Sequence, residues 1–226
     1  MSQFNVYDIF GYLLPGSVVV GVVLFVFWPF ADLDGMSSLA DGLAMLLGCY
    51  VLGHILRATI GQYVKSIKPS RELLSPASAI FSAPQKERII RALNTSFSLG
   101  LPAQPDGDQQ QEAFSLAYAA IVQNDVAGYV PLYNSLYALY RGLLAASMLA
   151  SIILAVNVCY WIGRGFPPTL HDHTSVVLVL LFSYLAWGGP RLKSPLRVQF
   201  DSYAQSFAIG VYRNFLAWRQ TKGLLG

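Results

Sequence analysis

The chain has 226 residues, of which 54% are hydrophobic and only 12% are charged. Soluble domains carry about 25% charged residues, so this chain lacks the polar side chains needed to cover a soluble surface. The composition therefore favours an integral membrane protein, and a net charge of +3 is too small to argue for nucleic-acid binding.

The chain begins with an aromatic stretch, YDIFGYLLPG at residues 7–16, which leads into the first long apolar run. The first twelve residues contain no Lys or Arg, and no A-x-A cleavage site follows, so we expect the run to be retained rather than removed as a signal peptide. We expect Asp8 to stay at the inner membrane surface, within reach of Arg57 or Arg191. The Tyr12 ring should lie at headgroup depth, where tyrosine is favoured.

The Pro15-Gly16 pair interrupts this run, and two placements are open. A proline is tolerated in the first turn of a helix. If the helix instead begins near Val6, Pro15 is interior and should kink it, because proline removes a hydrogen bond and clashes with the preceding turn. We favour the kinked version, in which residues 1–12 form a short interfacial helix and the axis breaks between Leu14 and Gly16.

Four apolar runs are long enough to be candidate membrane spans, since a spanning helix needs about 20 mostly apolar residues. They lie at residues 13–31, 39–56, 142–162 and 174–189. Four such runs leave too little polar chain to bury them all in a soluble core. We therefore predict four transmembrane helices.

The positions of the basic residues predict the orientation of these helices. Of the 15 Lys and Arg residues, only Arg164 falls in a predicted outer loop. The others flank the opposite ends of the spans, and basic flanks stay on the cytoplasmic side. We expect a bacterial inner-membrane protein with both termini in the cytoplasm.

The long insert between the second and third spans, residues 57–140, is predicted to be helical and cytoplasmic. One helix should start after Ser82, with Pro84 in its first turn. A second helix is expected over residues 108–123, after turn-forming residues at 101–107. Four tyrosines at helical spacing then lead into the third span, where we expect their rings at the inner membrane surface. These are Tyr129, Tyr133, Tyr137 and Tyr140.

The C-terminal segment, residues 196–222, carries an apolar stripe at helical spacing and predicts an amphipathic helix. The stripe consists of Phe200, Tyr203, Phe207, Val211, Phe215 and Trp218. Because the segment also carries Arg213, Arg219 and Lys222, it suits the inner leaflet, the insert or an oligomer contact. We expect it to pack together with the insert.

The predicted fold is thus an all-α integral membrane protein in four parts. Residues 1–56 contain the interfacial segment and the first two spans, and residues 57–140 form the insert. Residues 141–190 contain the third and fourth spans, and residues 191–226 form the C-terminal helix. Arg141 opens the third span.

Motifs for catalysis or metal binding are not found in the sequence. His54 and Arg57 share a helix face near the inner end of the second span. We interpret His54 as an interfacial histidine beside a snorkelling arginine, with a lipid-modifying enzyme as the alternative. His171 and His173 supply too few ligands for a metal. We expect no catalytic residues, no metal and no cofactor.

Transport is a second alternative. The spans contain almost no charge away from their ends, and Asn157 is the most polar deep residue. A proton-coupled carrier usually carries charged groups within the membrane. A pore built from several copies does not need such charged groups, so a small-solute channel or carrier is kept as an alternative.

The opening FNVYDIFGYLLPG, the later GHILR and the four-span plan resemble a group of small bacterial membrane proteins from anti-phage defence systems. The Kiwa membrane subunit and the membrane accessories of Cas13b-type CRISPR loci are of this type. The resemblance implies a non-enzymatic, oligomeric inner-membrane protein that works with a cytoplasmic protein partner. Our leading hypothesis adds that the assembled protein perturbs the membrane.

We accordingly expect contacts with the lipid bilayer, a second copy and a cytoplasmic protein, but not direct binding of nucleic acid. The residues expected at the membrane interface or the partner contact are Asp8, Tyr12, Pro15, Gly16, His54, Arg57, Tyr133, Tyr137, Arg141, Phe207 and Arg213.

Overall fold

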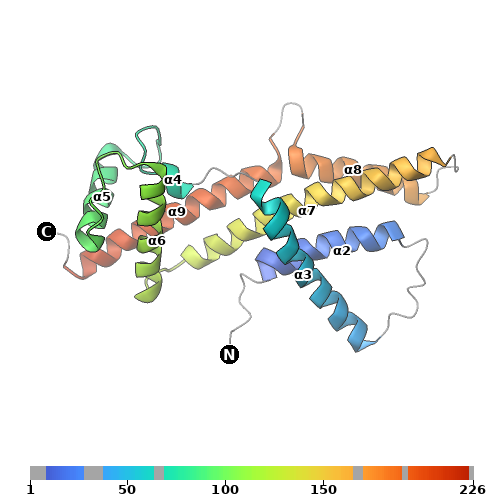
Figure 1. Ribbon diagram of the computed structural model, residues 1–226, viewed down its shortest axis with the longest axis horizontal. Coiled ribbons are helices and arrows are strands. Elements are labelled where there is room, and N and C mark those ends of the chain that lie inside the picture. Colours follow the sequence, from blue (N-terminus) through green and yellow to red (C-terminus); the bar gives the residue numbers. More distant parts are fainter. Residues whose placement is uncertain (1–8, 28–37, 64–68, 165–169, 190–192, 224–226) are drawn as a thin grey trace. The chain divides into compact units, whose positions relative to one another are not determined.

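The computed structural model describes residues 9–27, 38–63, 69–164, 170–189 and 193–223 (Figure 1). In this part of the chain the regular structure is helical and no strand occurs, which agrees with the predicted all-α class. The elements are the π-helical turn η1 (Ile9–Leu13) and the helices α2 (Leu14–Phe27), α3 (Leu39–Tyr63), α4 (Pro69–Glu72), α5 (Ala83–Phe97), α6 (Gly107–Gln123), α7 (Val130–Gly163), α8 (Leu170–Trp187) and α9 (Pro195–Thr221).

Three helical segments are long and apolar enough to cross a membrane, namely Ile9–Phe27, Leu39–Thr59 and Val130–Gly163. The third helix begins at Val130, well before the run at 142–162 that predicted it. The predicted fourth span corresponds to α8, whose apolar part, His173–Trp187, is shorter than the other three. The structure therefore supports a helical membrane protein with three candidate spans, and the fourth stays a prediction.

The Pro-Gly pair follows a change of helix type. The π-helical turn η1 ends at Leu13, and α2 starts at Leu14, so the change falls directly before Pro15. A proline has no N–H and clashes with the carbonyl four residues earlier in a regular α-helix. A π turn shifts the hydrogen-bond register by one residue and so lets the chain enter α2 without that conflict. The predicted interfacial helix at 1–12 lies largely outside the described residues.

The chain divides into two compact units, which we describe separately. Unit 1 comprises residues 1–65 and 135–200, and unit 2 comprises residues 66–134 and 201–226. Helices α7 and α9 each contribute residues to both units.

In unit 1, α2 and α3 pack against α7, and α8 lies along α7 (Figure 1). One apolar cluster joins the first three helices through Val19, Leu56 and Ala146. A second cluster, built around Val22 and Leu154, joins α2 and α7 to the inner face of α8. Most other apolar side chains of α3 and α8 are exposed, as expected for helices that face lipid.

In unit 2, α5, α6 and α9 surround one apolar core (Figure 1). Helix α5 begins after Ser82, whose N–H donates to Gln85 Oε1 over 2.9 Å, and Pro84 lies in its first turn. This confirms the predicted helix start. Asp106 caps α6 by accepting the N–H groups of Asp108 and Gln109, which a helix terminus otherwise leaves without partners.

The packing of α9 on the insert confirms that these two segments share a core. Val211 and Phe215 of the predicted apolar stripe are fully buried, but Tyr203 and Phe207 are only half-buried. The buried face of α9 runs instead through Ala204, Ala208 and Tyr212. The small residues on this face let α9 approach its neighbours closely. A pattern search based on large apolar residues overlooks such small residues.

Candidate functional site

The two segments that carry the resemblance, residues 9–16 and 53–57, meet in unit 1 through a backbone contact. A Cβ atom added to Gly16 would lie 1.8 Å from the carbonyl oxygen of Cys49. A Cβ atom added to Gly53 would lie 2.0 Å from the carbonyl oxygen of Tyr12. Real side chains do not approach backbone this closely, so only glycine fits at either position. Small residues allow such contact between membrane helices.

Pro15 completes this contact on the side of α7. A Cβ atom added to Gly142 would lie 2.4 Å from Cγ of Pro15, so the proline ring fills the space left by the missing side chain. Pro15 and Gly16 therefore touch two different helices, α7 and α3. The Pro-Gly pair, which the sequence suggested as a kink, is a point where α2 packs against α3 and α7.

A group of rings and one guanidinium lies at the same place. The Tyr12 ring stacks on the His54 imidazole with 3.7 Å between centroids and 12° between planes. Tyr50 meets His54 edge-on at 4.6 Å. Arg57 donates from Nη1 to the Tyr12 hydroxyl, and its Cζ lies 5.1 Å from the centre of that ring. His54 and Arg57, which were predicted to share a helix face, both contact Tyr12.

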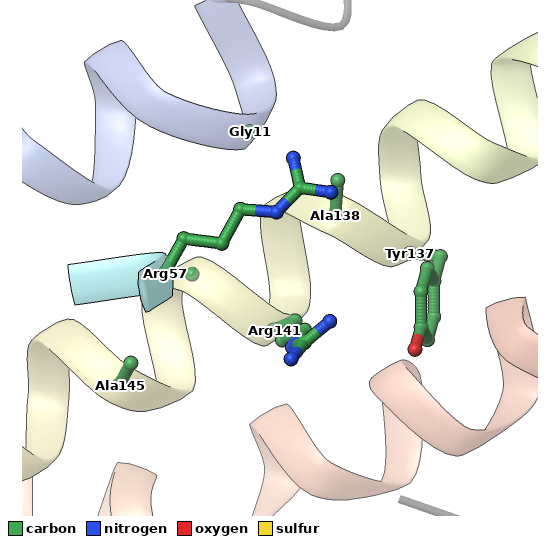
Figure 2. A pocket seen from close by; sticks show the side chains of 7 residues that line it. Gly11, Arg57, Tyr137, Ala138, Arg141 and Ala145 are labelled. Atoms are coloured by element: carbon green, nitrogen blue, oxygen red, sulfur yellow. The ribbon is translucent and has the colours of Figure 1, made fainter. Parts of the chain in front are cut away.

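A small pocket opens beside this group and is lined by residues of η1, α3 and α7 (Figure 2). Its cavity volume is about 20 Å³, which is room for about one water molecule. Two arginines, Arg57 from α3 and Arg141 from α7, supply its charged groups, and Tyr137 supplies a phenol. The other lining residues are Gly11, Ala138, Gly142 and Ala145, all of them small. None of the seven lining residues is acidic.

The close view shows how the charged side chains enter the pocket (Figure 2). Arg57 extends across α7 so that its guanidinium lies near Ala138, below the turn that carries Gly11. Arg141 and Tyr137 project from α7 itself, one turn apart. The Tyr137 ring also stacks on Phe200, 5.0 Å away, which fixes its orientation.

The remaining predicted site residues lie elsewhere. Asp8 is outside the described residues, as is Arg191, so the expected approach to Arg57 stays a prediction. Tyr133, Phe207 and Arg213 belong to unit 2. Phe207 packs on Phe114 and Tyr118, and Arg213 is exposed.

Unit 2 has a hollow of its own between the loop at residues 72–80 and α9. It has a cavity volume of about 360 Å³ and a mixed polar and apolar lining. Lys86 Nζ holds the loop in shape by donating to the carbonyls of Ser75 and Ser78 over 2.7 and 2.6 Å. The lining residues are Glu72, Leu73, Ser75, Ala77, Ser78, Ala79, Ile80 and Gln205.

Asn157, the most polar residue deep in a span, is used for helix packing. Its Nδ2 donates to Ser175 Oγ of α8 over 3.4 Å, and its Oδ1 accepts from Trp161 Nε1 over 3.1 Å. Hydrogen bonds of this kind join membrane helices. Among the described residues, no three His, Cys, Asp or Glu side chains converge so as to hold a metal ion. The side chains of His171 and Asp172 lie outside that part.

Sequence reasoning missed the part that several residues take in this site. Tyr50 and Gly53 are four and one residues before His54, and only the contact with Tyr12 reveals their part in the ring group. Ala138 and Ala145 lie three residues before and four residues after Arg141, so small residues on the helix face of a basic residue were the available signal.

No protein-family model matches the chain, and no curated protein or solved structure is significantly similar to it.

Proposed function

We propose that this protein is a non-enzymatic, oligomeric component of a bacterial inner membrane that binds a cytoplasmic protein through unit 2 and acts in anti-phage defence. The observation that carries the proposal is the division of the chain. All three candidate spans belong largely to unit 1, whereas unit 2 has an apolar core of its own. A membrane-bound adaptor requires such a division between a part that spans the membrane and a folded part that binds a partner.

Features of unit 2 support a role in binding rather than catalysis. The hollow at residues 72–80 is held open by backbone contacts with Lys86, and Ile80 at its rim is 38% exposed. A preformed groove with an exposed apolar side chain suits a protein partner.

A direct test of defence compares the plating efficiency of phages on cells that carry the native locus and on cells in which this gene has an early stop codon. We expect the plating efficiency of at least one phage in a panel to rise in the cells with the stop codon. Equal plating across a broad panel, with the protein present in the membrane fraction, would contradict a defence role.

Partner binding is tested by capturing the intact protein in mild detergent from cells that carry the whole locus. We expect a cytoplasmic product of the same locus to be captured, and Ile80→Asp to abolish its capture. Val122→Asp is the matched control, because Val122 is an exposed apolar residue of α6 outside the hollow. Loss of capture by both variants alike would argue against the hollow as the contact.

In this proposal the candidate spans of the oligomer perturb the membrane. Induced expression should then cause ion or dye leakage, and the purified oligomer should make liposomes permeable. Sealed liposomes that contain the purified oligomer would exclude a constitutive pore and leave the adaptor role.

A further inference from the structure

We infer that the hollow of unit 2 binds an arginine side chain of the cytoplasmic partner. The guanidinium lies on the Glu72 carboxylate, and an adjacent apolar side chain of the partner packs against Ile80. The inference rests on the proposed function and deepens it, because it states the chemistry that the partner must present. Its basis is the lining of the hollow, in which one carboxylate stands among hydroxyl, amide and small apolar groups.

The hollow is large enough for a long side chain and is shaped before binding. Its cavity volume of about 360 Å³ lies in the range of about 300–1,000 Å³ that is usual for ligand pockets. The loop that lines it is fixed by Lys86, whose Nζ donates to the carbonyls of Ser75 and Ser78 over 2.7 and 2.6 Å. Because the loop is already ordered, binding costs little further conformational entropy.

Glu72 is the charged residue among the eight that line the hollow. It is exposed, and its carboxylate makes no ion pair or hydrogen bond within the part of the chain that the structure describes. The neighbouring Arg71 does not neutralise it, because the Arg71 guanidinium pairs with Asp108 over 3.2 Å. Lys86 is outside the lining, and its ammonium lies on the loop carbonyls. The hollow therefore presents a negative charge that suits a cationic side chain.

The neutral polar groups of the lining favour a guanidinium over an ammonium. A carboxylate accepts two parallel N–H bonds from a guanidinium, which leaves three further donors. The amide oxygen of Gln205 and the hydroxyl oxygens of Ser75 and Ser78 are acceptors in the same lining. A lysine ammonium is a compact point charge with only three donors, so it would use fewer of these acceptors.

The apolar part of the lining gives the second contact. Ile80 is 38% exposed, and the small side chains of Ala77 and Ala79 leave room beside it. An exposed ion pair alone contributes little, because water and salt screen it. An apolar side chain of the partner on Ile80 would exclude water from the neighbouring pair and so strengthen it. Arginine next to an apolar residue is thus the combination that this lining fits best.

The test measures binding to the intact protein in mild detergent. Its probe is the cytoplasmic product of the locus that the protein captures, purified separately. We expect Glu72→Gln to weaken binding about tenfold at low salt, because it removes the charge and keeps the shape of the side chain. The difference from the wild type should shrink at high salt, which screens an ion pair. Glu112→Gln is the matched control, since Glu112 is an exposed acid of α6 outside the hollow, and it should bind as the wild type does.

A charge exchange identifies the arginine and guards against misfolding. Each exposed arginine of the probe is changed to glutamate in turn. We expect one of these variants to lose binding to the wild-type protein and to regain it with Glu72→Arg, which requires that Glu72→Arg be folded.

The inference is overturned if Glu72→Gln binds as tightly as the wild type, or if Glu72→Arg rescues none of the arginine variants. Capture that Ile80→Asp still abolishes would in that case leave the proposed function intact. If the intact protein captures no product of the locus, both the proposed function and this inference are wrong.

Discussion

The ring of Tyr12 lies flat on the imidazole of His54, with 3.7 Å between the two centroids. This stack joins the entry to the first span to the far end of the second, 42 positions later in the chain. It gives His54 a packing role, which is the interpretation favoured over catalysis.

The first prediction concerns this stack. His54→Ala should lower the stability of the detergent-solubilised protein by about 1 kcal/mol, because an aromatic pair contributes about 0.5–1.5 kcal/mol. His54→Phe keeps a flat ring and should restore most of that stability. Both variants should retain the phage-plating phenotype of the wild type. A phenotype lost in both variants at normal stability would point to an imidazole with a chemical role, and so to an enzyme.

The second prediction concerns the glycine contacts between α2 and α3. Gly16→Ala and Gly53→Ala should each lower the thermal midpoint strongly, since a Cβ atom at either position would overlap a backbone carbonyl. Overpacking costs about 1–3 kcal/mol, and backbone has less freedom to move than a side chain. Gly48→Ala is the control on the same helix, because a Cβ atom there meets nothing within 4 Å. If all three variants melt alike, the close approach of the helices is wrong.

A third prediction concerns the buried amide of Gln110 in unit 2. Its Oε1 accepts the N–H of Leu74 over 3.0 Å, and its Nε2 donates to the carbonyl of Pro105 over 2.9 Å. Gln110→Ala leaves both backbone groups without this partner and should cost about 2–4 kcal/mol, since each orphaned buried group costs about 1–3 kcal/mol. Gln123→Ala, at an exposed position on the same helix, should be nearly neutral. Chemical unfolding followed by circular dichroism would measure both, and equal effects would refute the bridging role.

The fourth prediction concerns alkaline pH. Burial raises the pKa of the Tyr212 phenol well above its ordinary value, and its hydroxyl has no hydrogen-bond partner among the described residues. Above pH about 10, the unfolded chain releases this proton while the folded chain keeps it, so stability falls as pH rises. Tyr212→Phe should therefore flatten the loss of thermal stability between pH 9 and 11.

At neutral pH the same variant should be as stable as the wild type or more so, because it removes a buried hydroxyl without a partner. A large loss of stability in Tyr212→Phe at pH 7 would mean that the hydroxyl is satisfied, for instance by a bound water.

Hydrophobic runs and capping residues were enough to predict the helical class, three helices long and apolar enough to span a membrane, and the start of α5. These features depend on local sequence, such as the Ser82 and Pro84 pair before α5. The apolar run at 142–162 marks only part of α7, which begins at Val130. The helical spacing of the tyrosines at 129–140, rather than their hydropathy, indicated the earlier turns of this helix.

The site itself was predicted as a set of residues and not as an arrangement. Tyr12, His54 and Arg57 were each identified, but their contact depends on how two helices cross, which Gly16 and Gly53 determine through space. The pocket likewise needs Arg141 of α7 beside Arg57 of α3. Contacts between residues so far apart in sequence follow from tertiary packing, which periodicity does not encode.

The central claim is that the spans cross the membrane and leave unit 2 in the cytoplasm. Labelling of single cysteines with a membrane-impermeant maleimide tests it most directly, in spheroplasts and on a background that lacks Cys49 and Cys159. Ser38→Cys, in the predicted outer connection, should be labelled in intact spheroplasts. Ser115→Cys, at an exposed position on α6, should be labelled only after lysis. Labelling of Ser115→Cys before lysis, or of Ser38→Cys only after it, would contradict the account.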